Sequence, residues 1–221
     1  ADISPADSAK RFSEEKGVAI HLGDAEFTGD DKIRVGEQTL RFKKAVIATG
    51  ARAAAPPIDG LDSVDYLNNE SLFSLTELPK SIGVIGAGPI GAEMAQAFAR
   101  FGSEVHVINV ATTALPREDP DAGRIVQTAL ERDGVQFHSA AQNLRLSDEQ
   151  GRVRMQADAS RGPVDVVVDK LLVAVGRAPN VDGLGLEAIG VEYDPRKGVR
   201  VDDHYQTTNP KVYAAGDVCS P

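Results

Sequence analysis

The 221-residue sequence holds little that would cross-link it or span a membrane: it has one cysteine, two methionines and no tryptophan. The single Cys219 excludes an internal disulfide or a redox-active cysteine pair within these residues, and such sparing use of cysteine is typical of cytoplasmic proteins. No apolar run reaches the ~18 residues that a membrane span needs. Asp and Glu outnumber Lys and Arg by 33 to 24, with no basic run, so we expect neither nucleic acid nor a membrane as a partner.

The two ends of the chain also lack familiar signals. The first residues are polar, so no signal peptide is expected. An opening helix is predicted, with Ser4 as its cap, Pro5 in its first position and Gly17 after its end. Because no initiator Met precedes that helix and the chain stops abruptly at Cys219-Ser-Pro221, we expect both ends to be cut from a longer protein.

The most informative stretch is Ser81–Glu93, which reads SIGVIGAGPIGAE. Its apolar run, Ile82–Ile85, predicts a short buried parallel strand. Gly86, Gly88 and Gly91 follow in G-x-G-x-x-G spacing. In a dinucleotide site these glycines allow a sharp turn, close approach of backbone N–H groups to a pyrophosphate, and tight packing of helix against strand.

A helix is predicted immediately after this turn, and its first residues would hold the phosphates. Pro89 suits the first helical position because its missing N–H is not needed there. The unpaired N–H groups of the first turn, to which Ile90 contributes, favour negative charge. A helix from Ile90 to Phe101 and a strand from Glu104 to Val110 complete a βαβ unit. The alternative is a glycine-rich turn that binds no ligand.

The remaining segments predict a mixed α/β chain. A second helix is expected from Pro120, capped by Asp119 and ended by Gly134. A short helix is expected within 68–78. The predicted strands are Val18–Leu22, a hairpin of Lys32–Val35 and Thr39–Phe42, Lys44–Gly50, Val135–Phe137, a meander of 143–146, 152–156 and 164–168, Lys170–Gly176, an extended Val199–Thr208, and Lys211–Asp217.

Three of these strands echo one another. Lys44–Gly50, Lys170–Gly176 and Lys211–Gly216 each begin with Lys, continue with apolar residues and end in small residues and Gly. The echo predicts two copies of one nucleotide-binding architecture, of which the first has lost its opening strand and glycine loop. The alternative is that buried strands converge on Val and Ala before Gly.

The chain resembles the flavin-dependent pyridine nucleotide-disulfide oxidoreductases. Four motifs carry the resemblance, in that family's order and spacing: Ala48-Thr-Gly50, Gly86-Ala-Gly-Pro-Ile-Gly-Ala-Glu93, Gly176-Arg-Ala-Pro-Asn180 and Ala215-Gly-Asp217. Ala95–Arg100 together with Arg117–Pro120 is most similar to the mercuric reductase branch and to dihydrolipoamide dehydrogenases. The resemblance covers essentially the whole chain.

The resemblance implies an α/β fold of two Rossmann-like domains, three-layered, with mainly parallel sheets plus a β-meander. Residues 1–68 and 186–221 would form an incomplete FAD-binding domain, and residues 69–185 an NAD(P)-binding domain. Implied contacts to NAD(P) come from Gly86, Gly88, Pro89, Ile90, Gly91, Glu93, Asn109, Val175 and Gly176. Implied contacts to FAD come from Ala48, Thr49, Gly50, Arg177 and Asp217. Glu93 would lie near the flavin and pair with a lysine supplied by a preceding segment; without the family it reads as a solvated first-turn acid.

The choice between NAD and NADP falls at the end of the second strand. An acidic residue there normally binds the ribose 2′-hydroxyl, and this sequence has Asn109 instead. NADP-preferring relatives carry Arg at the next position, here Val110. Arg117 is expected to be a surface charge before the helix; the alternative is that it reaches a 2′-phosphate. Because an amide both donates and accepts, the sequence favours NAD slightly, or poor discrimination.

Several features of such enzymes are absent from these residues: the redox cysteine pair, the first glycine loop, and a C-terminal dimerisation domain with a catalytic His. The parent enzyme, a homodimer by this resemblance, would pass a hydride from NAD(P)H to FAD and on to a disulfide or Hg(II). We expect the chain alone to hold no catalytic residue and to be inactive. The competing hypotheses are a non-catalytic nicotinamide-nucleotide-binding module and a structural relic with an empty pocket.

Two other patterns are dismissed. Tyr193 and Lys197 have the Y-x-x-x-K spacing of short-chain dehydrogenases, but Pro195 prevents the helix that this pair requires. The four histidines, at 21, 106, 138 and 204, lack ligand spacing for zinc, so no metal is expected.

Overall fold

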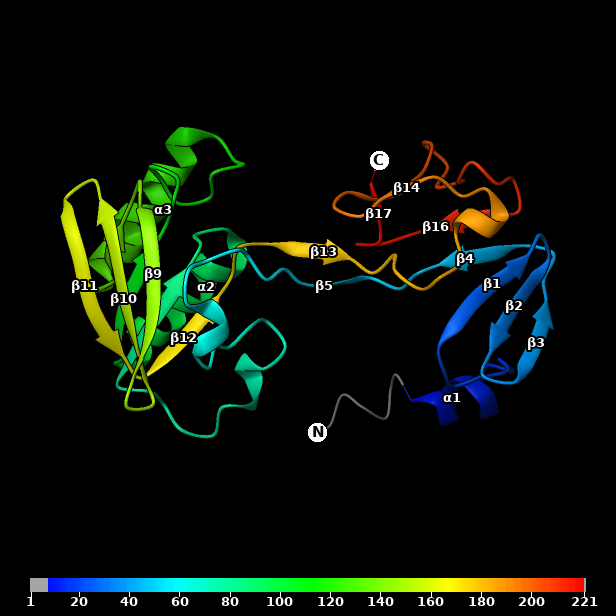
Figure 1. The fold of residues 1–221 in the computed structure, drawn as a ribbon, viewed down its shortest axis with the longest axis horizontal. Helices are drawn as coiled ribbons and strands as arrows, with labels where there is room; N and C mark the ends of the chain where they lie inside the picture. The colour runs from blue at the N-terminus through cyan, green and yellow to red at the C-terminus, as the bar shows by residue number, and fades with distance from the viewer. Residues whose placement is uncertain (1–7, 221) are drawn as a thin grey trace. The chain divides into compact units, whose positions relative to one another are not determined.

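The computed structural model describes residues 8–220, which fold as two compact units (Figure 1). Unit 1 comprises residues up to Arg52 together with those from Ala178 onward, and unit 2 comprises Ala53–Arg177. Unit 2 is therefore inserted into the chain of unit 1. Where the chain passes between them, β5 (Ala51–Ala53) pairs with β13 (Arg177–Pro179) as a two-stranded ribbon.

Unit 2 is built on a four-stranded parallel sheet. Its strands are β6 (Ser81–Ile85), β7 (Glu104–Ile108), β8 (Gln136–His138) and β12 (Lys170–Val173), in the order β12-β6-β7-β8. Every residue of β6 is buried, as expected for a central parallel strand covered on both faces. The chain leaves β6 toward β7 on one side and returns to β12 on the other, so the strand order reverses beside β6.

Two helices cover one face of this sheet. They are α2 (Pro89–Phe101) and α3 (Pro120–Arg132), and α3 is capped by the Asp119 side chain, which accepts from the N–H of Asp121. Side chains that alternate along the strands, such as Ile82 and Val105, share a core with Ala95 and Leu130 of the helices. The predicted βαβ unit is confirmed, and so is the second predicted helix, which begins at Pro120.

An antiparallel meander covers the opposite face (Figure 1). It consists of β9 (Gln142–Glu149), β10 (Arg152–Ala159) and β11 (Gly162–Val168) in the order β11-β10-β9. Ile85, Ile108 and Leu171 of the parallel sheet pack here against meander residues including Met155. Met155 lies so close to Gly83 that a Cβ there would meet its sulfur at 2.5 Å. A larger residue at 83 would therefore displace the end of the Met155 side chain. The predicted three-layer α/β class is confirmed.

The segment that enters unit 2 packs against the sheet without becoming a helix. Leu67 donates its N–H to the carbonyl of Leu171 and accepts from the N–H of Val173. The predicted helix within 68–78 is wrong: only the 3-10 turn η2 (Leu72–Ser74) forms, after another at η1 (Leu61–Ser63). The Asn68 side chain accepts the N–H groups of Glu70 and Ser71, which competes with helical hydrogen bonding. This segment packs on unit 2, whose residues, Ala53–Arg177, overlap most of the predicted NAD(P)-binding domain, 69–185.

Unit 1 is assembled from the two ends of the chain. Its first part has the short helix α1 (Ala9–Glu14), the antiparallel β1 (Ala25–Gly29), β2 (Lys32–Val35) and β3 (Gln38–Arg41), and β4 (Ala45–Ile47). Its second part has η3 (Glu187–Ile189), β14 (Tyr193–Asp194), β15 (Gly198–Arg200), β16 (Val212–Ala214) and β17 (Cys219–Ser220). Both parts share one core, in which Phe27 and Ile47 pack with Val199 and Val212.

Two predictions in unit 1 are wrong. Val18–Leu22 forms no strand, because the N–H of Val18 donates to the carbonyl of Phe12 and closes the end of α1, and no strand pairs with the residues that follow. The extended segment from Val199 ends at Arg200, where the Asp202 carboxylate accepts the N–H groups of His204 and Gln206 in a turn. The predicted cap Ser4 and the first helical position Pro5 lie outside the described residues; Ser8 caps the helix that is described.

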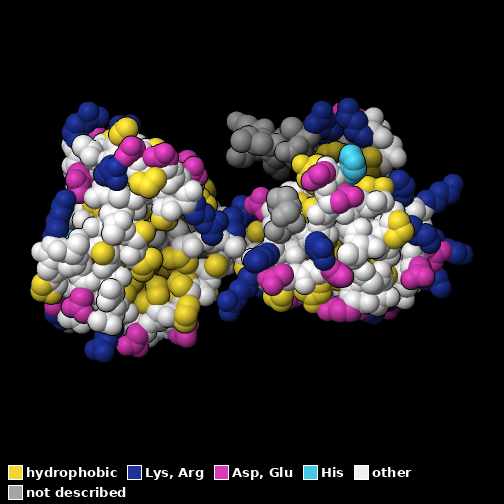
Figure 2. All heavy atoms as spheres, turned by 90° about the horizontal axis from the view of Figure 1, so that it is seen from above, with side chains coloured by type: hydrophobic (Ala, Val, Ile, Leu, Met, Phe, Trp, Pro, Cys, Tyr) yellow, Lys and Arg dark blue, Asp and Glu magenta, His cyan; other side chains and the backbone are white. Residues whose placement is uncertain are grey.

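Acidic and basic side chains are interspersed over the face drawn in Figure 2, without a broad field of either sign. Across residues 8–220 no helix is both long and apolar enough to cross a bilayer.

Candidate functional site: the glycine turn and the strand ends

The glycine turn lies where the parallel sheet changes direction. Ile85 is in register with Ile108 of β7 and with Val173 of β12, so three strands end at the same level. Ligands of open α/β sheets bind beyond the carboxyl ends of the strands, where the strand order reverses. Gly86 is the first residue past β6 at this point.

Each glycine of the turn meets a different requirement. Gly86 has a φ of +94°, and a Cβ there would lie 2.7 Å from the carbonyl oxygen of Ala174. At Gly91 a Cβ would lie 2.0 Å from the carbonyl oxygen of Gly86, so these two glycines allow strand, turn and helix to pack. A Cβ on Gly88 would meet nothing within 4 Å. No side chain therefore fills the space against Gly88.

Helix α2 begins at this open position. Gly88 is its N-cap and Pro89 its first residue. The first N–H groups of a helix have no intrahelical acceptor, so those of Ile90 and Gly91 point out of the turn with the positive end of the helix dipole. Glu93 is exposed, lies beyond the first helical turn, and makes no ion pair with any residue between 8 and 220.

Asn109 is buried beside the turn, with only 3% of its surface exposed. Its Oδ1 accepts the N–H of Ala87 at 3.3 Å, and its Nδ2 donates to the carbonyls of Ala111 at 3.1 Å and Thr113 at 2.9 Å. The next residue, Val110, is 82% exposed. Arg117 is exposed and has no ion-pair partner in the described part of the chain.

The end of β12 forms the other side of the turn. The N–H of Ala174 donates to the carbonyl of Ile85 at 2.8 Å, which fixes the two strand ends together. Val175 follows and is 40% exposed. The carbonyl of Gly176 accepts the N–H of Ala54, and Arg177 begins the ribbon strand β13 with an exposed side chain.

A second pair of strand ends meets in unit 1. The parallel strands β4 and β16 are in register, and beyond them the N–H of Ala215 donates to the carbonyl of Ile47 at 3.0 Å. The segments that carry Thr49 and Asp217 are therefore adjacent. Ala48, Thr49 and Asp217 are exposed.

Asn180 ties the segment after β4 in place, a role that the sequence did not indicate. Its Nδ2 donates to the carbonyl of Thr49 at 2.9 Å, the Thr49 hydroxyl donates to the carbonyl of Asn180 at 2.8 Å, and the N–H of Asn180 donates to the carbonyl of Gly50. Arg52 donates to the Asn180 Oδ1 and forms an ion pair with Asp182. The signal was present, because Asn180 ends one of the four motifs.

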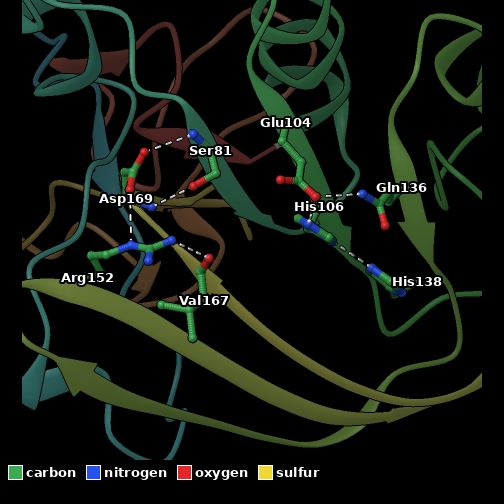
Figure 3. Close-up of polar contacts among 8 residues, drawn as sticks. All are labelled: Ser81, Glu104, His106, Gln136, His138, Arg152, Val167 and Asp169. Carbon is green, nitrogen blue, oxygen red and sulfur yellow. Dashed lines mark hydrogen bonds and ion pairs between the residues drawn. The ribbon is translucent and has the colours of Figure 1, made fainter.

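Two of the histidines come together although they lie far apart in the sequence. His106 of β7 and His138 of β8 stack with a separation of 3.2 Å between His106 Nδ1 and His138 Nε2. His106 Nε2 contacts Glu104, which also accepts from Gln136 (Figure 3). Burial, with the neighbouring His106 and Arg161, lowers the pKa of His138. Within residues 8–220 no group of three or more His, Cys, Asp or Glu is placed to hold a metal ion.

Two surface hollows lie away from the glycine turn. One of about 570 Å³ runs along α3 beside Ile125 and Arg132, and one of about 440 Å³ lies between His138 and Arg161. Neither includes a residue of the turn.

The fold and the glycine turn define a protein of the Rossmann-like class of nucleotide-binding proteins. The pyridine nucleotide-disulphide oxidoreductase family model matches residues 5–221, and the chain belongs to this family. The family comprises FAD-dependent oxidoreductases that use a nicotinamide nucleotide.

The similar proteins include three kinds of enzyme. A mercuric reductase from Lysinibacillus sphaericus is 38% identical over 207 residues, covering 93% of this chain and 38% of the relative. A dihydrolipoyl dehydrogenase from Bacillus subtilis (strain 168) is 36% identical over 204 residues, covering 90% of this chain and 44% of the relative. The HOCl-induced flavoprotein disulfide reductase RclA from Escherichia coli aligns with a TM-score of 0.79 and 35% identity, over 89% of this chain and 45% of that one. The chain thus spans less than half the length of each.

Proposed function

We propose that unit 2 binds a nicotinamide dinucleotide within an FAD-dependent NAD(P)H oxidoreductase, and that unit 1 contributes to the FAD site. In this proposal the NAD(P)-binding domain comprises residues 69–185, most of which belong to unit 2, and residues 1–68 and 186–221 are parts of the FAD-binding domain. The observation that carries it is the open turn at Gly88, at the carboxyl end of β6, where the strand order reverses.

The residues of the turn fit a pyrophosphate. Space against Gly88 is free of side chains, and the N–H groups of Ile90 and Gly91 lie at the positive end of α2. Gly86 and Gly91 hold strand and helix close enough to present those groups together. Val175 and Gly176, on the end of β12 beside Gly86, would flank the nicotinamide half of the ligand. NAD is favoured slightly over NADP, because Val110 stands where NADP-preferring relatives carry Arg.

The strand ends of unit 1 fit the FAD in a comparable way. Ala48, Thr49 and Gly50 follow β4 and Asp217 follows β16, and a Cβ on Gly50 or Gly216 would meet nothing within 4 Å. In the proposal Asp217 accepts hydrogen bonds from the ribityl chain, while Arg177 and Glu93 lie on the flavin side. When both cofactors are bound, reduced nicotinamide supplies a hydride and the flavin accepts it.

The terminal acceptor is proposed from the relatives. Their names, mercuric reductase and dihydrolipoyl dehydrogenase, place Hg(II) and a disulfide among the candidates. The single cysteine of the chain cannot form the dithiol that would reduce either acceptor. We therefore propose that these 221 residues alone are catalytically inactive, and that the whole enzyme is a cytoplasmic homodimer which engages neither nucleic acid nor membranes.

One observation favours a second candidate, a non-catalytic nicotinamide-nucleotide-binding module. The glycine turn and its supporting contacts lie entirely within unit 2, so nucleotide binding by this unit requires no flavin.

Thermal unfolding of the 221-residue chain with NADH, NADPH or FAD tests these proposals. A nicotinamide nucleotide at 100 times its Kd is expected to add about 2.7 kcal/mol to the unfolding free energy. Stabilisation by FAD as well supports the oxidoreductase proposal, whereas stabilisation by nicotinamide nucleotides alone supports the second candidate. No stabilisation by either nicotinamide nucleotide at millimolar concentration would overturn both.

A further inference from the structure

We propose that Asn109 is a positioning residue that fixes the phosphate-binding turn and is not the residue that distinguishes the adenosine ribose of NAD from that of NADP. The inference rests on the proposed nicotinamide site. It contrasts with what the position of Asn109 in the sequence suggests, since the residue at the end of the second strand is ordinarily the one that reads the ribose.

The hydrogen bonds of Asn109 leave it little capacity to read a ribose. A carboxamide has two N–H donors and an oxygen with two lone pairs. Both donors are directed at protein carbonyls, those of Ala111 and Thr113, and one lone pair accepts the N–H of Ala87. The side chain is buried, with 3% of the residue exposed. Its contacts lie within the protein.

Those contacts also explain why the residue is an amide. A carboxylate has no N–H to donate, so an Asp at this position would turn a negative oxygen toward the carbonyl oxygens of Ala111 and Thr113. The carbonyl of Thr113 would lose the Asn109 donor, the carbonyl of Ala111 would keep only the N–H of Ala140, and both would face a negative oxygen in a part-buried site, which is costly. Asn109 therefore donates hydrogen bonds to the carbonyls of the loop after β7, which an acidic side chain could not do.

The backbone of Asn109 is itself fixed on both sides. Its N–H donates to the carbonyl of His138 and its carbonyl accepts the N–H of Ala141. The side chain thus extends from a rigid strand end to the peptide of Ala87. The carbonyl of Ala87 in turn accepts the N–H of Leu115 at 2.8 Å. Both groups of Ala87 are held by the segment 109–115, immediately before the open Gly88.

Substitution of Asn109 should therefore weaken binding without changing which nucleotide is preferred. We expect Asn109→Asp in the 221-residue chain to raise the Kd for NADH and for NADPH by the same factor, roughly tenfold, the effect of a lost buried hydrogen bond. Asn109→Ser, which carries no charge, should also raise both Kd values equally. Kd would be measured by nucleotide fluorescence, with the melting temperature recorded for each variant.

Ser103→Ala is the matched control. Ser103 is buried at the opposite end of β7, where its hydroxyl donates to the carbonyl of Pro79 at 2.6 Å. This variant should lower the melting temperature comparably while leaving both Kd values unchanged. A gain in NADH affinity relative to NADPH in Asn109→Asp would overturn the inference, as would unchanged Kd values in a folded Asn109→Ser variant.

A measurement without ligand separates this inference from the proposed function. Hydrogen exchange at the Ala87 amide should accelerate roughly tenfold or more in Asn109→Ser, and not in Ser103→Ala. If the wild-type chain bound neither nucleotide, the proposed function would fail, and the exchange of Ala87 would still decide whether Asn109 holds the turn. Unaltered exchange in Asn109→Ser would show that it does not.

Discussion

Ser81 and Asp169 exchange hydrogen bonds at the amino ends of two neighbouring parallel strands. The N–H of Ser81 donates to Asp169 Oδ2 at 3.1 Å, and the N–H of Asp169 donates to Ser81 Oγ at 3.0 Å (Figure 3). Arg152 of the meander adds an ion pair to the same carboxylate. The start of β6, the start of β12 and the meander are thereby joined at the end of the sheet opposite to the glycine turn.

Removing the hydrogen bonds between Ser81 and Asp169 should lower the stability of the chain and leave nucleotide binding intact. We expect Ser81→Ala to lower the unfolding free energy by about 1 kcal/mol, since the part-buried N–H of Asp169 loses the Ser81 hydroxyl and keeps only the Ser81 carbonyl, at 3.2 Å, as its acceptor. Asp169→Asn keeps an acceptor but loses the half-exposed ion pair, so its loss should stay below about 1 kcal/mol. Chemical denaturation gives both values. A larger loss of unfolding free energy in Asp169→Asn than in Ser81→Ala would show that the ion pair with Arg152 contributes more than the hydrogen bonds between Ser81 and Asp169.

Substitution by alanine should have different effects at the second and third glycines of the turn, Gly88 and Gly91. At Gly91 the new Cβ would meet the carbonyl oxygen of Gly86 at 2.0 Å, so we expect Gly91→Ala to lower the unfolding free energy by about 3 kcal/mol. At Gly88 it would meet nothing, so Gly88→Ala should keep the melting temperature within a few degrees and weaken NADH binding roughly tenfold or more by filling the space of the phosphates. Thermal unfolding with and without NADH measures both. Normal NADH affinity in Gly88→Ala would show that the phosphates do not bind at this turn.

Protonation of His138 should destabilise unit 2 in mildly acidic solution. Because burial lowers its pKa in the folded chain, the unfolded chain takes up the proton first as the pH falls below about 6.5. The contribution of neutral His138 is thus complete above that pH and is lost as the pH falls toward the lowered value, with a slope of up to about 1.4 kcal/mol per pH unit.

Denaturation at pH 7.5 and 5.5 measures this slope. The variant His138→Gln should show a shallower decline than the wild type, whereas His204→Gln, at an exposed position in unit 1, should decline as the wild type does. An equal decline in all three proteins would assign the pH dependence to other groups.

The contacts between Thr49 and Asn180 should protect the segment that follows β4. Thr49→Val removes the hydroxyl that donates to the carbonyl of Asn180, and Thr49→Ser retains it. We expect hydrogen exchange at Gly50 and its neighbours to accelerate in Thr49→Val, corresponding to about 1 kcal/mol of local stability, and to stay close to the wild type in Thr49→Ser. Equal exchange in both variants would show that the hydroxyl does not hold the segment.

Local patterns in the sequence predicted most of unit 2. The cap at Asp119, the apolar periodicity of both helices and the buried run before Gly86 are each decided within a few residues, and the structure has all three. Unit 1 was harder to predict because some of its strands pair with strands far away in the sequence, as β4 does with β16. Strand β1 was missed: of its residues only Phe27 is buried, and its pairing with β2 is visible only in three dimensions. Val18–Leu22 carries three apolar residues that remain exposed, so alternation alone was misleading.

The turn was predicted in position, but the contacts that hold it were not. Glycine spacing located the turn because only glycine allows the close approaches at 86 and 91. The contacts of Asn109 depend on where the carbonyls of Ala111 and Thr113 lie, and those positions follow from a loop whose path no sequence pattern determines. Likewise, His106 and His138 meet only because β7 and β8 pair in a register that places Gln136 opposite His106.

The insertion of unit 2 into the chain of unit 1 imposes an order of events during synthesis. Strand β4 leaves the ribosome before all of unit 2, and its partner β16 leaves after it. Residues 53–177 can therefore bury their own core while β4 still has an open edge, and unit 1 closes last. Open strand edges invite pairing with other chains, so the early completion of unit 2 limits the later step within unit 1 to the docking of the segment after residue 177.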